Sequence, residues 1–261
     1  MVAMPFPSDQ EILAGLLVLL RISMIMSFIP VLSHQAIPPP IKIGLIITVT
    51  AVVLPVVLHT IPPVPANPVL YAILAVQELM IAGMLSLLAQ LIFTSVQFAG
   101  QIMSYQVGMA IANVFDPSTQ AQGAVTGTFA SVLAMMLWLA TNTHLIFLQA
   151  MMDSFTLMPP GQPWSFAGWE QLSHATSLMF SLAIRLVAPV MILIFFVYVA
   201  LGLVARAVPQ IQVFFISFPL TIGLGFIVFA ASFPAFIHLV QHSFIGLGHE
   251  LPMFLHKMSG T

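Results

Sequence analysis

The chain has 261 residues, of which 60% are hydrophobic and only 5% are charged. Soluble domains carry about 25% charged residues, so the composition excludes a water-soluble domain and indicates a chain surrounded by lipid or by other proteins. The formal net charge of -2 provides no basic footprint for nucleic acid. The absence of cysteine excludes disulfides, thiolate catalysis and cysteine-ligated metal centres.

Six apolar segments meet or approach the length of about 20 residues that a helix needs to span a bilayer core. They cover residues 12–32, 43–58, 69–96, 124–152, 175–205 and 211–240. The intervening loops are short and rich in proline, and none is long enough to hold a separate soluble domain. The sequence therefore predicts an all-α membrane protein that forms one helical unit.

Charged residues interrupt this apolar pattern at four places. They are Arg21, Glu78, Arg185 and Arg206. A charge at bilayer depth is costly unless it is paired or hydrated. One interpretation gives these residues a function, for example in a secondary transporter that uses Glu78 and Arg185. The other interpretation is that they form pairs between helices or face an aqueous lumen.

The third segment continues without a charge from Leu79 to Phe115. A straight helix over this stretch would be about 55 Å long, which exceeds one hydrocarbon core of about 30 Å. We therefore expect either a helix that projects beyond the membrane or a chain that folds back.

Small residues recur at every fourth position on both sides of Asp116. The first ladder is Gly100, Ser104, Gly108 and Ala112, and the second is Gly123, Gly127 and Ser131. This spacing places small residues on one helix face, where two backbones can approach closely. Asp116 precedes Pro117, a pair that disfavours continuation of one helix and can begin another. The pattern predicts a tight helical hairpin near Asp116.

Uncharged amides make this hairpin polar. They are Gln90, Gln97, Gln101, Gln106, Asn113, Gln120 and Gln122. Amides in a charge-free pair of helices favour an interface or a passage that contains water over direct exposure to lipid. A packing hairpin without any part in a pore is the alternative.

A second hairpin is predicted near the C-terminus. Two apolar stretches, residues 186–205 and 213–240, are joined by a polar turn. The residues of this turn that we single out are Arg206, Pro209, Gln210 and Gln212. Pro189, Pro219 and Pro234 each remove a backbone hydrogen bond, so the two helices should be bent.

Signals for an enzyme are weak. His249, Glu250 and His256 do not have the spacing of a zinc helix, and Pro252 is expected to break the helix that such a site needs. His144 would be required in an intramembrane hydrolase, but no nucleophile elbow accompanies it. We predict no enzymatic activity, no metal and no cofactor.

Three blocks of the chain resemble the FliR family, the export-gate subunit of flagellar type III secretion. The first block runs from Leu20-Arg21-Ile22 to Lys42-Ile43-Gly44-Leu45, and the second from Val107-Gly108-Met109 through Phe115-Asp116-Pro117 to Asn142-Thr143-His144-Leu145. The third block contains Ala200-Leu201-Gly202-Leu203, Arg206, Pro209-Gln210-Ile211 and Ser217-Phe218-Pro219-Leu220. The chain departs from the family at Thr143, where glycine is usual, at Pro39-Pro40, where the family has a basic residue, and at Ile111 and Val114, where phenylalanine is frequent.

The resemblance implies long bent helical hairpins packed in a hetero-oligomeric export gate. Residues 1–174 would form a FliP-like part and residues 175–261 a FliQ-like hairpin and tail. The implied partners are FliP-like, FliQ-like and FlhB-like subunits, unfolded exported proteins and membrane lipid. The implied location is the bacterial inner membrane, within the flagellar basal body, and an injectisome gate is the alternative.

The resemblance also suggests where a conduit would be sealed. The candidate pore or plug residues are Met109, Ile111, Val114, Phe115 and Asp116. Gly100, Ser104, Gly108, Gly123 and Gly127 would pack the hairpin that carries them. The tip formed by Arg206, Pro209, Gln210 and Gln212 would line the cytoplasmic entrance, and Arg21, Glu78 and Arg185 would be charges within the membrane.

Overall fold

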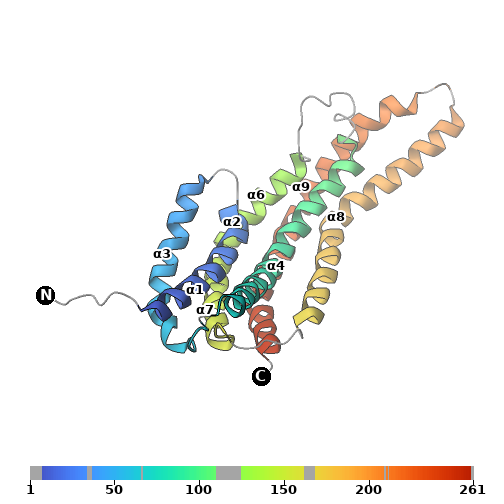
Figure 1. Cartoon of the computed structure of the whole chain (residues 1–261). Coiled ribbons are helices and arrows are strands. Elements are labelled where there is room, and N and C mark those ends of the chain that lie inside the picture. Colours follow the sequence, from blue (N-terminus) through green and yellow to red (C-terminus); the bar gives the residue numbers. More distant parts are fainter. Residues whose placement is uncertain are drawn as a thin grey trace. The chain divides into compact units, whose positions relative to one another are not determined.

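The computed structural model describes residues 8–33, 37–65, 67–109, 125–161, 168–208, 210 and 212–259. Within these ranges the regular elements are all helices (Figure 1). They are α1 (Asp9–Phe28), α2 (Pro30–Ser33), α3 (Pro39–Val57), the 3-10 helix η1 (Leu58–Thr60), α4 (Pro68–Gln106), α6 (Val125–Ala140), α7 (Thr143–Leu157), α8 (Gly168–Ala207) and α9 (Val213–Ser259).

Five helical stretches of the described chain are long and apolar enough to cross a membrane. They are α1, α3 with η1, α4, α8 and α9, and the number rises to six if α6 and α7 are counted as one broken span. The predicted all-α membrane protein is therefore confirmed.

Two of the predicted apolar segments are broken helices. α1 ends at Phe28 because Pro30 disfavours the helical conformation of the residue before it, and Ile29 adopts an extended conformation. The segment 124–152 breaks between Ala140 and Thr143, where Asn142 has a left-handed φ of 55°. A short polar residue such as asparagine tolerates this conformation better than most residues do.

The last helix is longer than the sequence predicts. α9 continues past residue 240 to Ser259 because Leu247, Leu251, Phe254 and Met258 recur every three or four residues and are buried. The prediction that Pro252 breaks this helix is wrong, since the described residues on both sides of it remain helical. A proline inside a helix removes one backbone hydrogen bond, and the neighbouring turns keep theirs.

The long charge-free stretch allowed two alternatives, a projecting helix or a chain that folds back, and α4 bears on both. Its 39 residues correspond to a length of about 58 Å, longer than one hydrocarbon core. The chain then folds back, because Thr126 near the start of α6 bonds to Gly100 and Trp138 near its end packs on Phe93. α6 is therefore antiparallel to the second half of α4. The predicted turn at Asp116 lies outside the described residues.

The chain divides into two compact units. Unit 1 comprises Met1–Gln90, Asn142–Ala175 and Ile245–Thr261, and unit 2 comprises Leu91–Thr141 and Thr176–Phe244. α4, α8 and α9 each contribute to both units. The predicted division near residue 174 concerns resemblance to other subunits and stays a prediction.

Unit 1 packs α3 beside α1 (Figure 1). α1 begins with a capping box, in which Glu11 N–H donates to Ser8 Oγ at 3.3 Å and Ser8 N–H donates to Glu11 Oε2 at 2.7 Å. Ala14, Leu17 and Val64 form a buried cluster, against which the side chains of Leu13, Leu58, Ile61, Tyr71, Leu74 and Ala75 pack.

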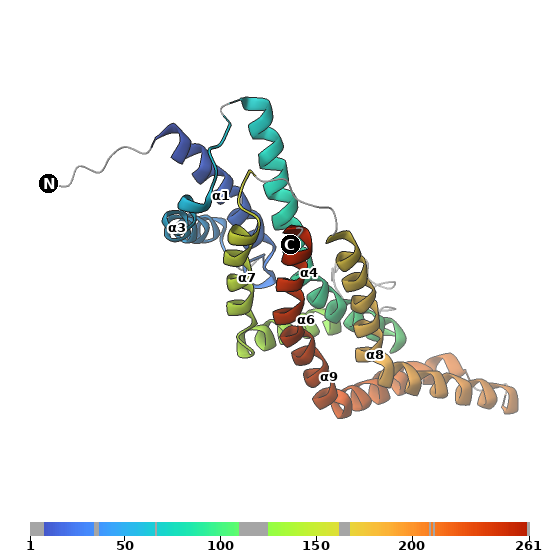
Figure 2. The ribbon, with the colours of Figure 1, turned by 90° about the horizontal axis from the view of Figure 1, so that it is seen from below.

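Unit 2 contains a helical hairpin and an aromatic cluster. The later part of α8 and the first part of α9 lie side by side in both views (Figures 1 and 2). Phe93, Trp138 and Phe244 pack with ring centroids 5.2–5.3 Å apart. Phe195 and Phe196 are each 63% exposed on α8, which suits a helix that faces lipid or another subunit.

Candidate functional site

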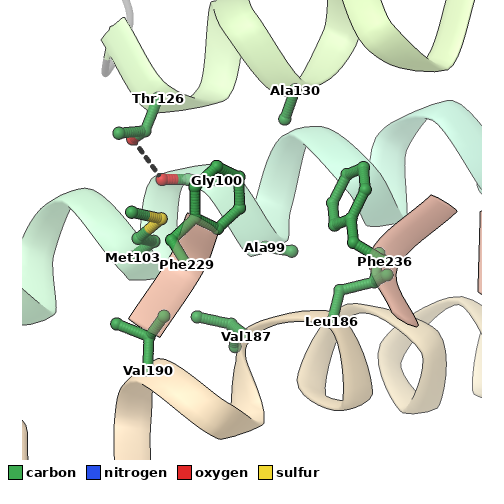
Figure 3. Close-up of a pocket in the computed structure, with 10 residues that line it drawn as sticks. All are labelled: Ala99, Gly100, Met103, Thr126, Ala130, Leu186, Val187, Val190, Phe229 and Phe236. Carbon is green, nitrogen blue, oxygen red and sulfur yellow. Dashed lines mark hydrogen bonds between the residues drawn. The ribbon is translucent and has the colours of Figure 1, made fainter. Parts of the chain in front are cut away.

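Two glycines bring the second half of α4 against the start of α6 in unit 2 (Figure 3). A Cβ added to Gly100 would lie 2.6 Å from Gly127 Cα, so the two helices would have to move apart. The hydroxyl of Thr126 donates a hydrogen bond of 2.7 Å to the carbonyl oxygen of Gly100. Backbones approach this closely only where small residues leave room. The crossing therefore requires glycine at position 100.

Apolar side chains close the space around this crossing (Figure 3). They come from α4, α6, α8 and α9, and they are Ala99, Met103, Ala130, Leu186, Val187, Val190, Phe229 and Phe236. The cavity that they leave has a volume of about 10 Å³, close to the smallest space that holds one water molecule. The space enclosed at this crossing is therefore no larger than about one water molecule.

α4 ends in a turn that glycine favours. Val107 N–H donates to Met103 O at 3.0 Å, and Gly108 N–H donates to Tyr105 O at 3.2 Å. Gly108 has a φ of 86°, in the left-handed region that commonly terminates helices. Met109 follows directly and is half-buried. The turn therefore ends directly before Met109, the first of the predicted pore residues.

Several predicted site residues cannot be placed. Ile111, Val114, Phe115, Asp116, Gly123 and Pro209 lie outside the described residues. Ser104 is buried on α4. The pore and plug assignments therefore stay predictions.

Unit 1 contains a buried ion pair. Arg21 Nε donates to Glu78 Oε2 at 2.5 Å, and the two side chains are 0% and 1% exposed. Arg21 Nη1 donates to the carbonyl oxygen of Ser154 at 2.7 Å, and Nη2 to that of Met158 at 2.9 Å. The guanidinium carbon lies 4.5 Å from the centre of the Phe155 ring. Three helices, α1, α4 and α7, thus meet at one guanidinium.

This arrangement satisfies a charge that would otherwise be costly to bury. The guanidinium binds carbonyl oxygens at the C-terminal end of α7, where the helix dipole favours a cation. The carboxylate of Glu78 balances its charge. Arg21 and Glu78 therefore form a pair between helices, whereas the transporter interpretation combined Glu78 with Arg185. Arg185 is exposed on α8.

The predicted tip of the second hairpin is exposed. Arg206 lies in the last turn of α8, where its charge is favourable for the helix dipole. Gln210 and Gln212 follow, and both are exposed. These side chains are available to a partner or to solvent at the end of the hairpin.

The histidines form no metal centre in the described ranges, where no group of three or more histidine, aspartate or glutamate side chains could hold an ion. His144 Nδ1 is buried and has no hydrogen-bond partner among the described residues. A catalytic histidine is normally oriented by a second group, and the structure describes none for this nitrogen.

Sequence reasoning missed three residues that hold helices together. Ser154 and Met158 supply the carbonyl oxygens for Arg21. Every residue has a carbonyl oxygen, so the residue types do not show which of them act as acceptors. Thr221 is 1% exposed and bonds to Val107. The available signal was a single threonine within the otherwise apolar stretch of residues 218–231.

Comparisons with known proteins identify the family to which the chain belongs. A family described as bacterial export proteins, family 1, matches residues 12–247. The flagellar biosynthetic protein FliR of Escherichia coli K12 is 32% identical over 232 residues, which is 87% of this chain and 86% of that protein. FliR of Bacillus subtilis 168 is 32% identical over 88% of this chain and 90% of its own length. FliR of Pectobacterium carotovorum is 30% identical over 92% of both chains. The chain therefore belongs to the FliR family of bacterial export proteins.

Proposed function

We propose that this chain is a core subunit of the flagellar protein export gate and that it forms the conduit together with FliP-like and FliQ-like subunits. The observation that carries this proposal is the match of nearly the whole chain to a family of bacterial export proteins whose relatives are named as flagellar biosynthetic proteins. The chain acts in this proposal by forming a passage and a seal, and not as an enzyme.

The exposed apolar surface supports an assembly in the membrane. Large apolar side chains are exposed on α3 at Ile41 and Val52, on α8 at Phe195 and Phe196, and on α9 at Phe215. These helices are long and apolar enough to cross a membrane, so their exposed side chains fit contact with lipid or with another protein. The proposed neighbours are FliP-like, FliQ-like and FlhB-like subunits in the bacterial inner membrane, within the flagellar basal body. Unfolded flagellar proteins are the proposed cargo.

We name residues 109–116 the gate segment and propose that it closes the conduit. Met109, Ile111, Val114 and Phe115 are bulky and apolar, and apolar constrictions can exclude water and ions. Methionine can re-pack around different passing chains. The close Gly100–Gly127 crossing supports this assignment because it holds together the two helices that flank residues 110–124.

An in-frame deletion in the source bacterium tests the proposed function. Hooks and filaments are scored by electron microscopy, and secreted proteins are measured in the medium, with a plasmid copy of the gene as the control. We expect hooks and filaments to disappear, basal structures to remain, and the plasmid copy to restore the flagella. Intact flagella with an altered set of secreted proteins would identify an injectisome gate, and no change in either would contradict an export function.

A further inference from the structure

The C-terminal end of α1, the short helix α2 and the start of α3 lie together at one end of unit 1 (Figure 1). They line a pocket of about 250 Å³, which is far more space than one water molecule needs. Its lining residues are Met26 and Ser27 from α1, Leu32 from α2, and Lys42 and Ile46 from α3. The pocket thus combines three apolar side chains with one hydroxyl group and one ammonium group.

This pocket lies at the ends of two helices that are long and apolar enough to cross a membrane, α1 and α3. Met26 and Ser27 belong to the last turn of α1, and Lys42 belongs to the first turn of α3. Further along α3, Ile43 and Ile47 are exposed, as expected for a helix that faces lipid. Lysine at the end of such a helix extends its ammonium group toward the interface and keeps its stem on apolar surface. The ammonium group of Lys42 therefore lies at the level of the lipid headgroups.

The distribution of charge in this part of the sequence favours an anion at the pocket. Residues 12–77 include two basic residues, Arg21 and Lys42, and no acidic residue. Arg21 is bound to Glu78 in the interior, so Lys42 gives this end of the unit its positive sign. The two acidic residues of α1 lie in its first turn, at the opposite end of the helix. Basic residues beside membrane spans favour the cytoplasmic side, where anionic lipids give the membrane a negative surface potential.

We propose that this pocket binds the headgroup of an anionic phospholipid. Lys42 and Ser27 donate hydrogen bonds to the phosphate oxygens, and the apolar side chains of the pocket contact the first carbons of the acyl chains. An ammonium group has three N–H donors, whereas the two prolines that begin α3 have none on their backbone nitrogens. A free phosphate ion would leave the apolar side chains uncovered, which favours a lipid as the source of the phosphate. This inference concerns binding and does not depend on the proposed export function.

Crosslinking to a photoreactive phosphatidylglycerol tests the proposal. The chain is purified from the bacterial membrane with its accompanying subunits and placed in phosphatidylcholine bilayers that contain a small fraction of this probe. Peptide mass spectrometry then measures the adduct on the five lining residues per molecule of the chain. We expect Lys42→Gln to lower the adduct about fivefold, the effect of one basic residue near an anionic surface. Lys42→Arg should retain it, and so should Lys257→Gln, which removes the same charge from an exposed position in the last turn of α9.

A second pair of variants tests the pocket without changing any charge. Ser27 is exposed, so Ser27→Trp can fill the pocket and should lower the adduct, whereas Thr48→Trp adds the same ring at an exposed position of α3 outside the pocket and should not. Equal adducts from Lys42→Gln and Lys257→Gln, or from Ser27→Trp and Thr48→Trp, would overturn the proposal.

Competition identifies the source of the phosphate. Unlabelled phosphatidylglycerol should displace the probe, while additional phosphatidylcholine and inorganic phosphate should not. Displacement by phosphatidylcholine at the same concentration as phosphatidylglycerol would show that the pocket does not select an anionic headgroup. Displacement by inorganic phosphate would identify a site for a free anion. Either result would contradict a site for an anionic phospholipid.

Discussion

Removal of the carboxylate that pairs with Arg21 gives a quantitative prediction for unit 1. In Glu78→Ala the guanidinium stays buried between three helices and keeps its bonds to the carbonyl oxygens of Ser154 and Met158. Its charge, however, loses the carboxylate 2.5 Å away. The variant therefore leaves an uncompensated positive charge in a site that water does not reach.

The expected loss is large for a single substitution. Breaking a buried ion pair by removing one partner costs about 3–5 kcal/mol of folding free energy, which corresponds to a fall in Tm of about 10 °C for a chain of this size. Arg21→Met combined with Glu78→Leu should recover part of this loss because no charge remains. The recovery is incomplete, since the carbonyl oxygen of Met158 then loses the donor that Arg21 supplies, at a cost of about 1–3 kcal/mol. The carbonyl oxygen of Ser154 still accepts a hydrogen bond from Met158 N–H.

The assay is the thermal denaturation of the purified complex, with the abundance of the chain in membranes measured in parallel. Glu170→Ala is the matched control, because Glu170 is exposed in the first turn of α8 and its loss should cost less than about 1 kcal/mol. Equal Tm values for Glu78→Ala and Glu170→Ala would refute the reasoning, as would a double variant less stable than Glu78→Ala.

Three further predictions concern unit 2, the seal and the absence of catalysis. Gly100→Ala should destabilise the complex by about 1–3 kcal/mol through overpacking. Gly127→Ala should be tolerated, because its new Cβ meets ordinary contacts at 3.5 Å or more. Similar Tm values for the two variants would contradict the close crossing. Replacing Ile111, Val114 and Phe115 together by glycine should raise ion leakage when the complex is expressed, and unchanged leakage would disprove the seal. Cells with His144→Ala should still form filaments in electron micrographs. Loss of the filaments at normal amounts of the chain would support a chemical function for this histidine.

Much of the helical architecture follows from the sequence, because long apolar runs and short polar loops leave few alternatives in a membrane. The ladders of small residues directed attention to Gly100 and Gly127, whose backbones the structure brings together. The break at Asn142 did not follow, since asparagine tolerates the left-handed conformation but does not require it. Pro252 was misjudged because the buried residues on both sides of it stabilise α9 more than one missing hydrogen bond weakens it.

The sequence also did not show which of the charged residues pair with one another. Arg21 and Glu78 both stood out, but they are 57 residues apart, and Arg185 was an equally plausible partner for Glu78 by composition. The backbone oxygens that complete the site carry no residue signature. The bond from Thr221 to Val107 likewise joins residues that are 114 apart in the chain.

Site-specific photo-crosslinking tests most directly whether this chain lines the export conduit. A photoreactive residue is placed at Met109, at the start of the gate segment, or at Ile41, which is exposed on α3, and an exported flagellar protein is stalled by a folded fusion partner. Our account predicts an adduct with the stalled protein from position 109 and none from position 41. Absence of the adduct at 109, or equal adducts at both positions, would contradict it.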